Sequence, residues 1–300
     1  MNQNPGKRAR HKGGWGSAAV RFGRRLAREW RRMGTGLCFV TFMLSGLFLA
    51  LTVYPLLRLL PLRARLRKRV ALGIVQKGFR LFMGYMQAWR VITRFRVEGL
   101  QNLPGNGPFL FIANHPTLID VVAILGVLPR CNCIVKKALW HSFYLGGVMR
   151  QAGFLPNDTG MVFIRSVEKC FAEGYSLMVF PEGTRSPPGD LGSFNRGAAQ
   201  VALRTGVTVI PIRVECEPLT LIKGEPWYRV PPRSVTFTLR IFAPLDMPRQ
   251  VLEKKNTPLK VRSLTRYFES FYRELLGLPR SSSRSGPDPG GETETGRIPL

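Results

Sequence analysis

The sequence predicts an α/β fold in which a mixed sheet is flanked by helices, and an apolar segment precedes this fold. From Val97 onward, short apolar runs of strand character alternate with longer runs of helical spacing, an order typical of a sheet covered by helices. Upstream, residues 34–57 carry no charge, although the whole chain has a net charge of +27. Because 45% of the residues are apolar, wholesale disorder is excluded.

Most of the positive charge lies in the first third of the chain. Residues 1–33 form a basic N-terminal segment with ten Lys or Arg and one Glu, and residues 58–96 carry eleven Lys or Arg and no acid. The uncharged run 34–57 separates these blocks and is long enough, as a helix, to cross a bilayer core of about 30 Å. Its apolar stretch is longer than that of a signal peptide. It therefore predicts a membrane helix, and the alternative is a buried helix of a soluble protein.

The two basic flanks bear on how this helix meets a membrane. Lys and Arg accumulate on the cytoplasmic side, so a single crossing would leave one basic block on the opposite side. A helix that enters one leaflet and returns keeps both blocks at anionic headgroups. Single-pass and one-leaflet insertion both remain open at this point.

The second basic block has the spacing of an amphipathic helix. Its apolar side chains recur at helical intervals, at Val75, Phe79, Phe82, Met86 and Trp89. This pattern predicts a helix that lies at a membrane interface. A helix packed on the protein's own core shows the same stripe, and one helix can do both. Residues 34–96 are therefore assigned to a membrane helix plus a basic amphipathic helix.

Residues 97–276 are predicted to form the globular domain. Strands are expected at 108–113, 133–135, 177–180, 207–212 and 235–242. Helices are expected at 118–128, 140–149, 161–171, 194–204 and 259–276. Residues 277–300 are rich in Ser, Gly and Pro, which predicts a disordered tail.

Composition argues against several kinds of site and partner. The five cysteines include no Cys-x-x-Cys pair, so a disulfide framework and a zinc ribbon are not expected, and a reducing compartment is indicated. No metal site is expected. The basic blocks accompany long aliphatic runs without a recognition motif, so nucleic acid is not expected as a partner.

The first cluster with chemical potential is Asn114-His115-Pro116-Thr117-Leu118-Ile119-Asp120, directly after a predicted strand. On one helix, His115 and Asp120 would point about 140° apart. They meet if His115 lies in the loop and Asp120 in the first turns of the next helix, which Pro116 permits. A carboxylate on one imidazole nitrogen makes the other a general base for a hydroxyl proton. Alone, this spacing more often marks a loop histidine beside an unrelated Asp.

The second cluster, Phe180-Pro-Glu-Gly-Thr-Arg-Ser186, also ends an apolar strand. Gly183 lets the backbone approach a ligand closely, and Arg185 offers a planar fork for a phosphate or carboxylate. Thr184 and Ser186 add hydroxyl donors. Glu182 would hold either Arg185 or a substrate hydroxyl. For this cluster alone, a loop ion pair between Glu182 and Arg185 is the simpler interpretation.

Together and in this order, the two clusters resemble the glycerolipid acyltransferase family that includes 1-acylglycerol-3-phosphate acyltransferases. The first resembles the family's Asn-His-x4-Asp block, and the second its Phe-Pro-Glu-Gly-Thr-Arg-Ser block at every position. Lys136-Lys-Ala-Leu139 and Val209-Ile-Pro-Ile212 resemble two further family blocks. The resemblance covers roughly residues 97–245.

The resemblance implies an α/β domain on an N-terminal membrane-embedded helical pair. The domain would face the cytoplasm, with a bacterial inner membrane expected. The implied reaction moves a fatty acyl chain from acyl-CoA or acyl carrier protein to the hydroxyl of a lysolipid, without a cofactor and without an acyl-enzyme. His115 would be the base, and Asp120 would orient it. The acceptor headgroup would be bound by Glu182, Gly183, Thr184 and Arg185.

One block departs from the family pattern of a glycine, a few apolar residues and an arginine that grips the acceptor phosphate. Here the stretch ends in Asn157-Asp158, and a carboxylate repels a phosphate. Asn157 and Asp158 are therefore expected to affect acceptor selectivity, with Arg165 as the nearby replacement for the arginine. The alternatives are a non-phosphate acceptor such as an amino-acid lysolipid, a CoA-independent transacylase, and a non-enzymatic membrane-binding protein. The intact first cluster argues against the last.

Overall fold

The structure is a computed structural model that describes residues 14–279, apart from residues 106, 144, 159 and 255. Residues 1–13 of the basic segment and residues 280–300 of the predicted disordered tail lie outside the described residues. The strands are β1 (Arg94–Glu98), β2 (Leu110–Ala113), β3 (Cys131–Val135), β4 (Leu155–Pro156), β5 (Ser176–Val179), β6 (Val209–Glu217) and β7 (Thr236–Ile241).

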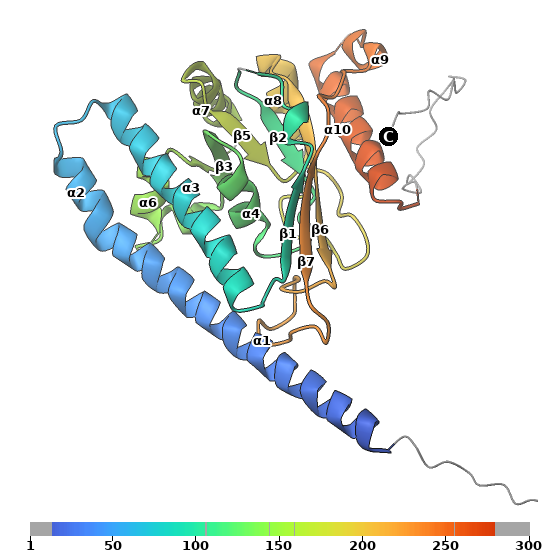
Figure 1. Ribbon diagram of the computed structural model, residues 1–300. Helices are drawn as coiled ribbons and strands as arrows, with labels where there is room; N and C mark the ends of the chain where they lie inside the picture. The colour runs from blue at the N-terminus through green and yellow to red at the C-terminus, as the bar shows by residue number, and fades with distance from the viewer. Residues whose placement is uncertain (1–13, 106, 144, 159, 255, 280–300) are drawn as a thin grey trace, which may run out of the picture.

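The helices cover the first third of the chain and then alternate with the strands (Figure 1). They are α1 (Gly14–Phe48), a π-helix (Leu49–Val53), α2 (Tyr54–Leu59), α3 (Ala64–Ala88), a 3₁₀ helix (Leu100–Asn102), α4 (Asp120–Val127), α5 (Lys137–Trp140), α6 (Gly146–Ala152), α7 (Gly160–Ala172), α8 (Gly197–Thr205), α9 (Arg249–Leu252) and α10 (Thr257–Leu275).

The strands form one sheet with the order β1-β7-β6-β2-β5-β3-β4. The pair β6–β7 is antiparallel, and every other neighbouring pair is parallel. The predicted mixed sheet flanked by helices is therefore confirmed. Strands β2, β5 and β6 run in the same direction, so their carboxyl ends meet at one edge of the sheet.

The core has two parts, one on each face of the sheet. In β2, Phe111 and Ala113 join the apolar cluster under α3 and α4, whereas Leu110 and Ile112 join the cluster under α7, α8 and α10. This alternation is the two-residue period of a strand whose faces are both covered. Because both faces are buried, β2 contains only apolar residues, and polar side chains begin immediately after it.

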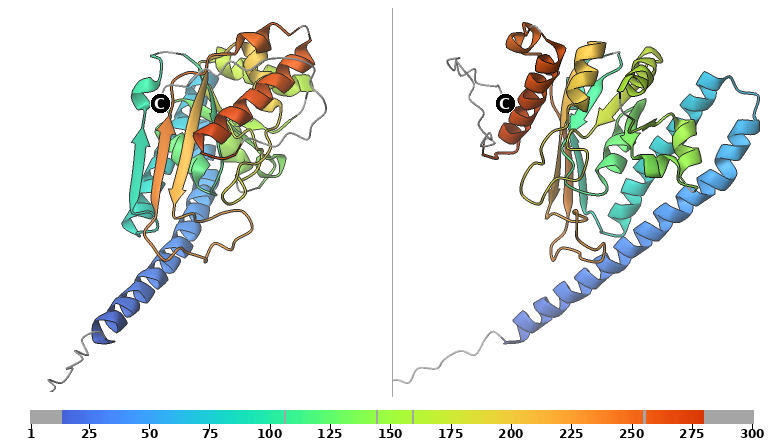
Figure 2. Two further views of the ribbon diagram at one scale, coloured as in Figure 1. Left: turned by 90° about the vertical axis from the view of Figure 1, so that its right-hand side faces the viewer. Right: turned by 180° about the vertical axis from the view of Figure 1, so that it is seen from behind.

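The N-terminal helical region is longer than the uncharged run from which it was predicted. Residues Val20–Leu59 form the only helix of the described chain that is long and apolar enough to cross a membrane. The boundary predicted at residue 33 falls inside α1. Arg28, Arg31 and Arg32 donate to backbone carbonyls of residues 228–232, with Arg31 Nη2 2.8 Å from the Pro232 oxygen. These arginines therefore dock α1 on the β6–β7 connection (Figure 2).

The predicted amphipathic helix is α3, and its apolar stripe faces the protein. Val75 and Met86 are buried, and Phe79, Phe82 and Trp89 pack against the same core cluster. The apolar face of α3 therefore fits the alternative interpretation, in which the helix packs on the protein's own core. A membrane-embedded pair of helices stays a prediction.

The helix predicted over 140–149 is instead two short helices, α5 and α6. They are separated by residues 141–145, where the Ser142 hydroxyl accepts a hydrogen bond from the Leu145 amide. The chain then turns so sharply that a Cβ on Gly146 would lie 2.4 Å from the Trp140 carbonyl oxygen. β1 and β4 were not predicted, because β1 carries charged residues on the sheet edge and β4 has only two residues.

Candidate active site

The two sequence clusters meet at the carboxyl edge of the sheet. His115 lies in the loop between β2 and α4, and Asp120 is the first residue of α4. Glu182, Arg185 and Ser186 lie in the loop that follows β5. Because β2 and β5 are parallel neighbours, these loops leave the sheet side by side, and the Ser186 amide donates to the His115 carbonyl at 2.7 Å.

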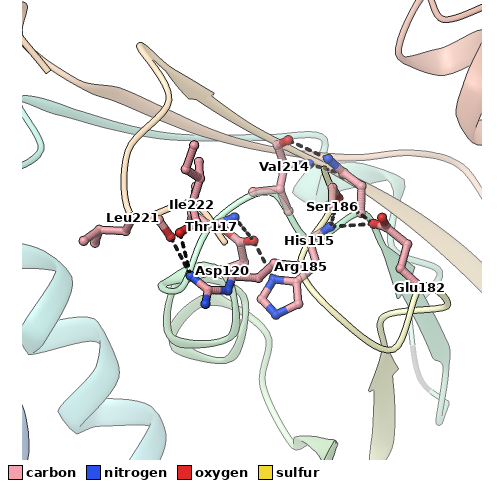
Figure 3. A network of polar contacts seen from close by, with 10 residues as sticks. His115, Thr117, Asp120, Glu182, Arg185, Ser186, Val214, Leu221 and Ile222 are labelled. Carbon is pink, nitrogen blue, oxygen red and sulfur yellow. Dashed lines mark hydrogen bonds and ion pairs between the residues drawn. The ribbon is translucent and has the colours of Figure 1, made fainter. Parts of the chain in front are cut away.

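His115 and Asp120 form a hydrogen-bonded pair (Figure 3). The distance from His115 Nδ1 to Asp120 Oδ2 is 2.8 Å. The imidazole stacks on the Phe180 ring, with centroids 4.0 Å apart, and its side chain is 16% exposed. With Nδ1 held by the carboxylate, Nε2 is the nitrogen left to exchange a proton with a ligand.

Asp120 is held rigidly and without contact with solvent. Its side chain is fully buried, and the Thr117 amide donates to Oδ2 at 2.8 Å while the Thr117 hydroxyl donates to Oδ1. Burial raises the pKa of the Asp120 carboxyl, and the hydrogen bonds from His115 and Thr117 oppose this rise. The local sequence folds this way because Thr117 lies in the turn that leads into α4 and Asp120 is the first residue of that helix, where a carboxylate also faces the positive end of the helix.

Glu182 organises the backbone of both loops. Its Oε1 accepts hydrogen bonds from the Ser186 hydroxyl at 2.6 Å and from the His115 amide at 3.2 Å, and its Oε2 accepts one from the Gly192 amide at 2.8 Å. Burial raises the pKa of Glu182, against the effect of these donors. The simple ion pair with Arg185 considered from the sequence is not among the contacts of the described residues.

Arg185 reaches the β6–β7 connection. One guanidinium nitrogen, Nη1, donates to the carbonyl oxygens of Leu221 and Ile222, each at 3.0 Å (Figure 3). Gly183 and Thr184 are exposed next to it, and Gly183 has φ +65°, a conformation that favours glycine. This arrangement leaves Thr184 open to a ligand and gives Arg185 a structural contact in addition to any role in headgroup binding.

The block that departs from the family pattern, which ends in Asn157-Asp158, lies beside the basic stretch Lys136-Lys-Ala-Leu139 that follows β3. The backbone N–H of Asn157 donates to the Val135 carbonyl. Asp158 forms an ion pair with Lys137 at 2.8 Å. Lys137 is 61% exposed and Asp158 is 31% exposed. Arg165 is exposed on α7. Its predicted role as a substitute for the missing arginine stays a prediction, as do the roles of Asn157 and Asp158.

No individual role was predicted from the sequence for Asn114 or Thr117, and Ser186 was expected only as a hydroxyl donor. Asn114 exchanges two hydrogen bonds with the Val214 backbone, at 2.8 and 2.9 Å, and so ties the end of β2 to β6. Thr117 and Ser186 hold the two carboxylates in place. A buried polar residue directly after an apolar strand was the available signal for Asn114, but its partner on β6 lies a hundred residues away.

Stability is expected to decrease as pH rises above the usual pKa of an aspartic acid, because the pKa of Asp120 is raised in the folded state. Its raised pKa means that the folded state keeps a proton that the unfolded state has released, so the stabilisation is present at low pH and is lost as pH passes the folded-state pKa. Urea unfolding of the full chain in neutral detergent at several pH values measures this. In Asp120→Asn the decrease should be smaller, because an amide does not titrate. Parallel curves for the two proteins would contradict it.

The part of the chain that holds the site matches a known sequence family. Residues 94–215 match the family model described as Acyltransferase, a stretch that contains both clusters. The resemblance noted from the sequence is therefore confirmed, and this match begins at the first residue of β1.

Part of the chain is also similar to curated relatives. The chain is 33% identical over 125 residues to 1-acyl-sn-glycerol-3-phosphate acyltransferase LPAT1, chloroplastic, of Arabidopsis thaliana, a match that covers 40% of this chain but only 35% of that protein. It is 26% identical over 160 residues to 1-acyl-sn-glycerol-3-phosphate acyltransferase of Pseudomonas aeruginosa, covering 51% of this chain and 60% of that protein.

A solved structure has the same fold. The crystal structure of the 1-acyl-sn-glycerophosphate (LPA) acyltransferase PlsC from Thermotoga maritima matches with a TM-score of 0.62 and 23% identity. The match covers 88% of this chain and all of the other. At this identity the likeness concerns the arrangement of the helices and strands.

Proposed function

We propose that this chain, whose residues 94–215 belong to the acyltransferase family, transfers a fatty acyl chain from an acyl thioester to the hydroxyl of a lysolipid. The acceptor is 1-acylglycerol-3-phosphate or a related lysophospholipid. The observation that carries the proposal is the His115–Asp120 pair, because it leaves one imidazole nitrogen free at the edge of the sheet to act as a base. No cofactor takes part in the proposed reaction.

In the proposed reaction His115 Nε2 removes the proton from the acceptor hydroxyl as the oxygen attacks the thioester carbonyl carbon. Asp120 holds the ring through Nδ1 and stabilises the imidazolium that forms. The tetrahedral intermediate then collapses with cleavage of the carbon–sulfur bond. The leaving thiolate takes the proton from His115, so that the thiol and the acylated lipid are released and the enzyme returns to its starting state.

The exposed face of α1 supports membrane association. One stripe of this helix is apolar and exposed between residues 22 and 48, at Phe22, Leu26, Trp30, Met33, Leu37, Val40, Leu44 and Phe48. Other side chains of α1, such as Cys38 and Phe42, pack on the folded domain. A helix covered on one side by a polar domain cannot cross a bilayer without taking that domain into the hydrocarbon. We therefore infer insertion into one leaflet, with the catalytic domain on the cytoplasmic side.

Acceptor selectivity is expected to depend on Asp158. Its carboxylate pairs with Lys137 and reduces the positive charge that Lys137 offers to an acceptor phosphate. In Asp158→Ala the rate with lysophosphatidate, relative to the rate with uncharged monoacylglycerol, should rise about three- to fivefold, the size of an interaction between partly exposed charges. Parallel acyl-transfer assays with the two acceptors measure this ratio.

The matched control for this change is Asp246→Ala, which removes an exposed carboxylate next to Tyr267. It should leave the ratio of the two rates unchanged. Equal ratios in wild type, Asp158→Ala and Asp246→Ala would remove Asp158 from acceptor selection. The alternative of a non-phosphate acceptor rests on the Lys137–Asp158 pair. A wild-type enzyme that prefers the uncharged acceptor or an amino-acid lysolipid would favour this alternative.

Acyl transfer by the purified full chain in neutral detergent tests the proposal. The donors are oleoyl-CoA and oleoyl acyl carrier protein, offered separately with a panel of lysolipids. Formation of a diacyl product with release of thiol is the expected result. Product formed from phospholipid as the sole acyl source would identify a CoA-independent transacylase instead, and no product from any donor would reject acyltransferase activity.

A further inference from the structure

Three arginines from separate helices line a small cavity outside the candidate active site. The cavity has a volume of about 230 Å³ and is lined by Arg58 of α2, Arg67 of α3 and three residues of α6, Gly147, Arg150 and Gln151. Helix α6 contacts both α2 and α3, and Figure 1 shows it beside both. The cavity shares no residue with the His115 site.

The arginines keep free donors toward this cavity. Arg67 uses Nη2 to bind the carbonyls of Leu60 and Leu62, but within the described chain its buried Nε has no partner. Arg150 donates through Nη1 to the Trp140 carbonyl at 2.8 Å. The side chain of Arg58 has no hydrogen bond or ion pair to any described residue. The buried side-chain oxygen of Gln151 is likewise without a partner among the described residues, and rotation of the amide turns its NH₂ to the same place.

An anion is the ligand that this arrangement fits. No acidic side chain is among the described residues that line the cavity, so three like charges lie together without compensation. Guanidinium groups present paired N–H donors whose spacing matches the oxygens of a phosphate. The volume is below the range of about 300–1,000 Å³ that encloses a whole small molecule. A phosphate group with the rest of its ligand outside the cavity fits these limits.

The surroundings of the arginines indicate that the rest of the ligand is apolar. Leu56 and Leu59, on either side of Arg58 in α2, are 63% and 80% exposed. Leu66, next to Arg67 in α3, is 47% exposed. We propose that Arg58, Arg67 and Arg150 bind the phosphate of an anionic membrane phospholipid, whose acyl chains lie along these leucines. This second lipid site rests on the membrane association in the proposed function, but not on acyl transfer.

Lipid retention by the full chain in neutral detergent tests the site, counted by intact mass measurement of the complex without an acyl donor. The probe is dioleoylphosphatidylglycerol, with dioleoylphosphatidylcholine as the zwitterionic comparison and inorganic phosphate, at the same concentration as the lipid, as the competitor. Wild type should retain the anionic lipid in preference to the zwitterionic one. Arg58→Gln should weaken this retention roughly tenfold, which is the change in affinity expected for the loss of one hydrogen bond to a charged group. Arg58→Lys should weaken it less.

Arg25→Gln is the matched control, because Arg25 is exposed on α1 and its loss changes the net charge equally. It should retain the anionic lipid as wild type does. Equal retention by Arg58→Gln and Arg25→Gln would overturn the site and leave only general attraction between charges. Displacement of the lipid by this equal concentration of inorganic phosphate would overturn the assignment to a lipid, because contacts with the acyl chains should hold a lipid more tightly than phosphate alone. Because no donor is present, these outcomes are independent of whether the chain transfers acyl groups.

Discussion

His115→Ala is expected to lower the rate of acyl transfer by about 10²- to 10⁴-fold, the usual contribution of a general base. The imidazole is the only group that the described site places to take the hydroxyl proton, since Asp120 is fully buried and Glu182 is engaged by three donors. Retention of the fold should be checked by urea unfolding. Measured thiol release with each acceptor gives the rate.

His141→Ala is the matched control for this substitution. His141 is exposed in the segment between α5 and α6, and its replacement should leave the rate unchanged. A His115→Ala protein that is folded and still transfers acyl chains at the wild-type rate would show that the base lies elsewhere. Equal losses in the two histidine variants would show an effect unrelated to the His115–Asp120 pair.

Asp120→Asn is expected to lower kcat by up to about 10⁴-fold, by analogy with the change of the carboxylate to an amide in a histidine-based triad. The amide keeps the shape of the side chain but has no charge to stabilise the imidazolium. The NH₂ of the amide also replaces a carboxylate oxygen that accepts a hydrogen bond from Thr117 or His115. Because Asp120 acts through His115 and is buried away from any ligand, KM for the acceptor should change much less than kcat.

The split between kcat and KM distinguishes a positioning role from a structural one. A general loss of structure would change KM and the unfolding midpoint together with kcat. Thr117→Val, which removes the hydroxyl donor to Asp120, should give a smaller loss of kcat of the same kind. Wild-type kcat in Asp120→Asn would contradict the assigned role.

The sequence was informative wherever a strand ended and polar residues began. β2 and β5 are short and largely apolar runs, and the two functional clusters directly follow them. The clusters meet at one edge of the sheet because β2 and β5 are parallel neighbours, and the alternation of strands and helices in the sequence does not specify which strands are neighbours. The contact between His115 and Asp120 depended on where α4 begins, and α4 begins at Asp120 itself.

Contacts between distant segments could not be predicted. Arg185 finds its acceptors at Leu221 and Ile222, in a long connection that has no local signal for this role. The pairing of Lys137 with Asp158 depends on β3 and β4 lying side by side, and β4 has too few residues to show a pattern. The direction faced by the α3 stripe was equally undetermined, since helical spacing reports that a face is apolar but not what covers it.

The measurement that tests the central claim most directly is the release of thiol from oleoyl-CoA or oleoyl acyl carrier protein before and after lysophosphatidate is added to the purified full chain. Direct transfer with His115 as the base predicts no release and no acyl adduct in the intact mass before addition, then rapid release with formation of phosphatidate, and neither in His115→Ala. A burst of thiol with an acylated protein before any acceptor is present would contradict direct transfer. The same rate in His115→Ala would contradict the site.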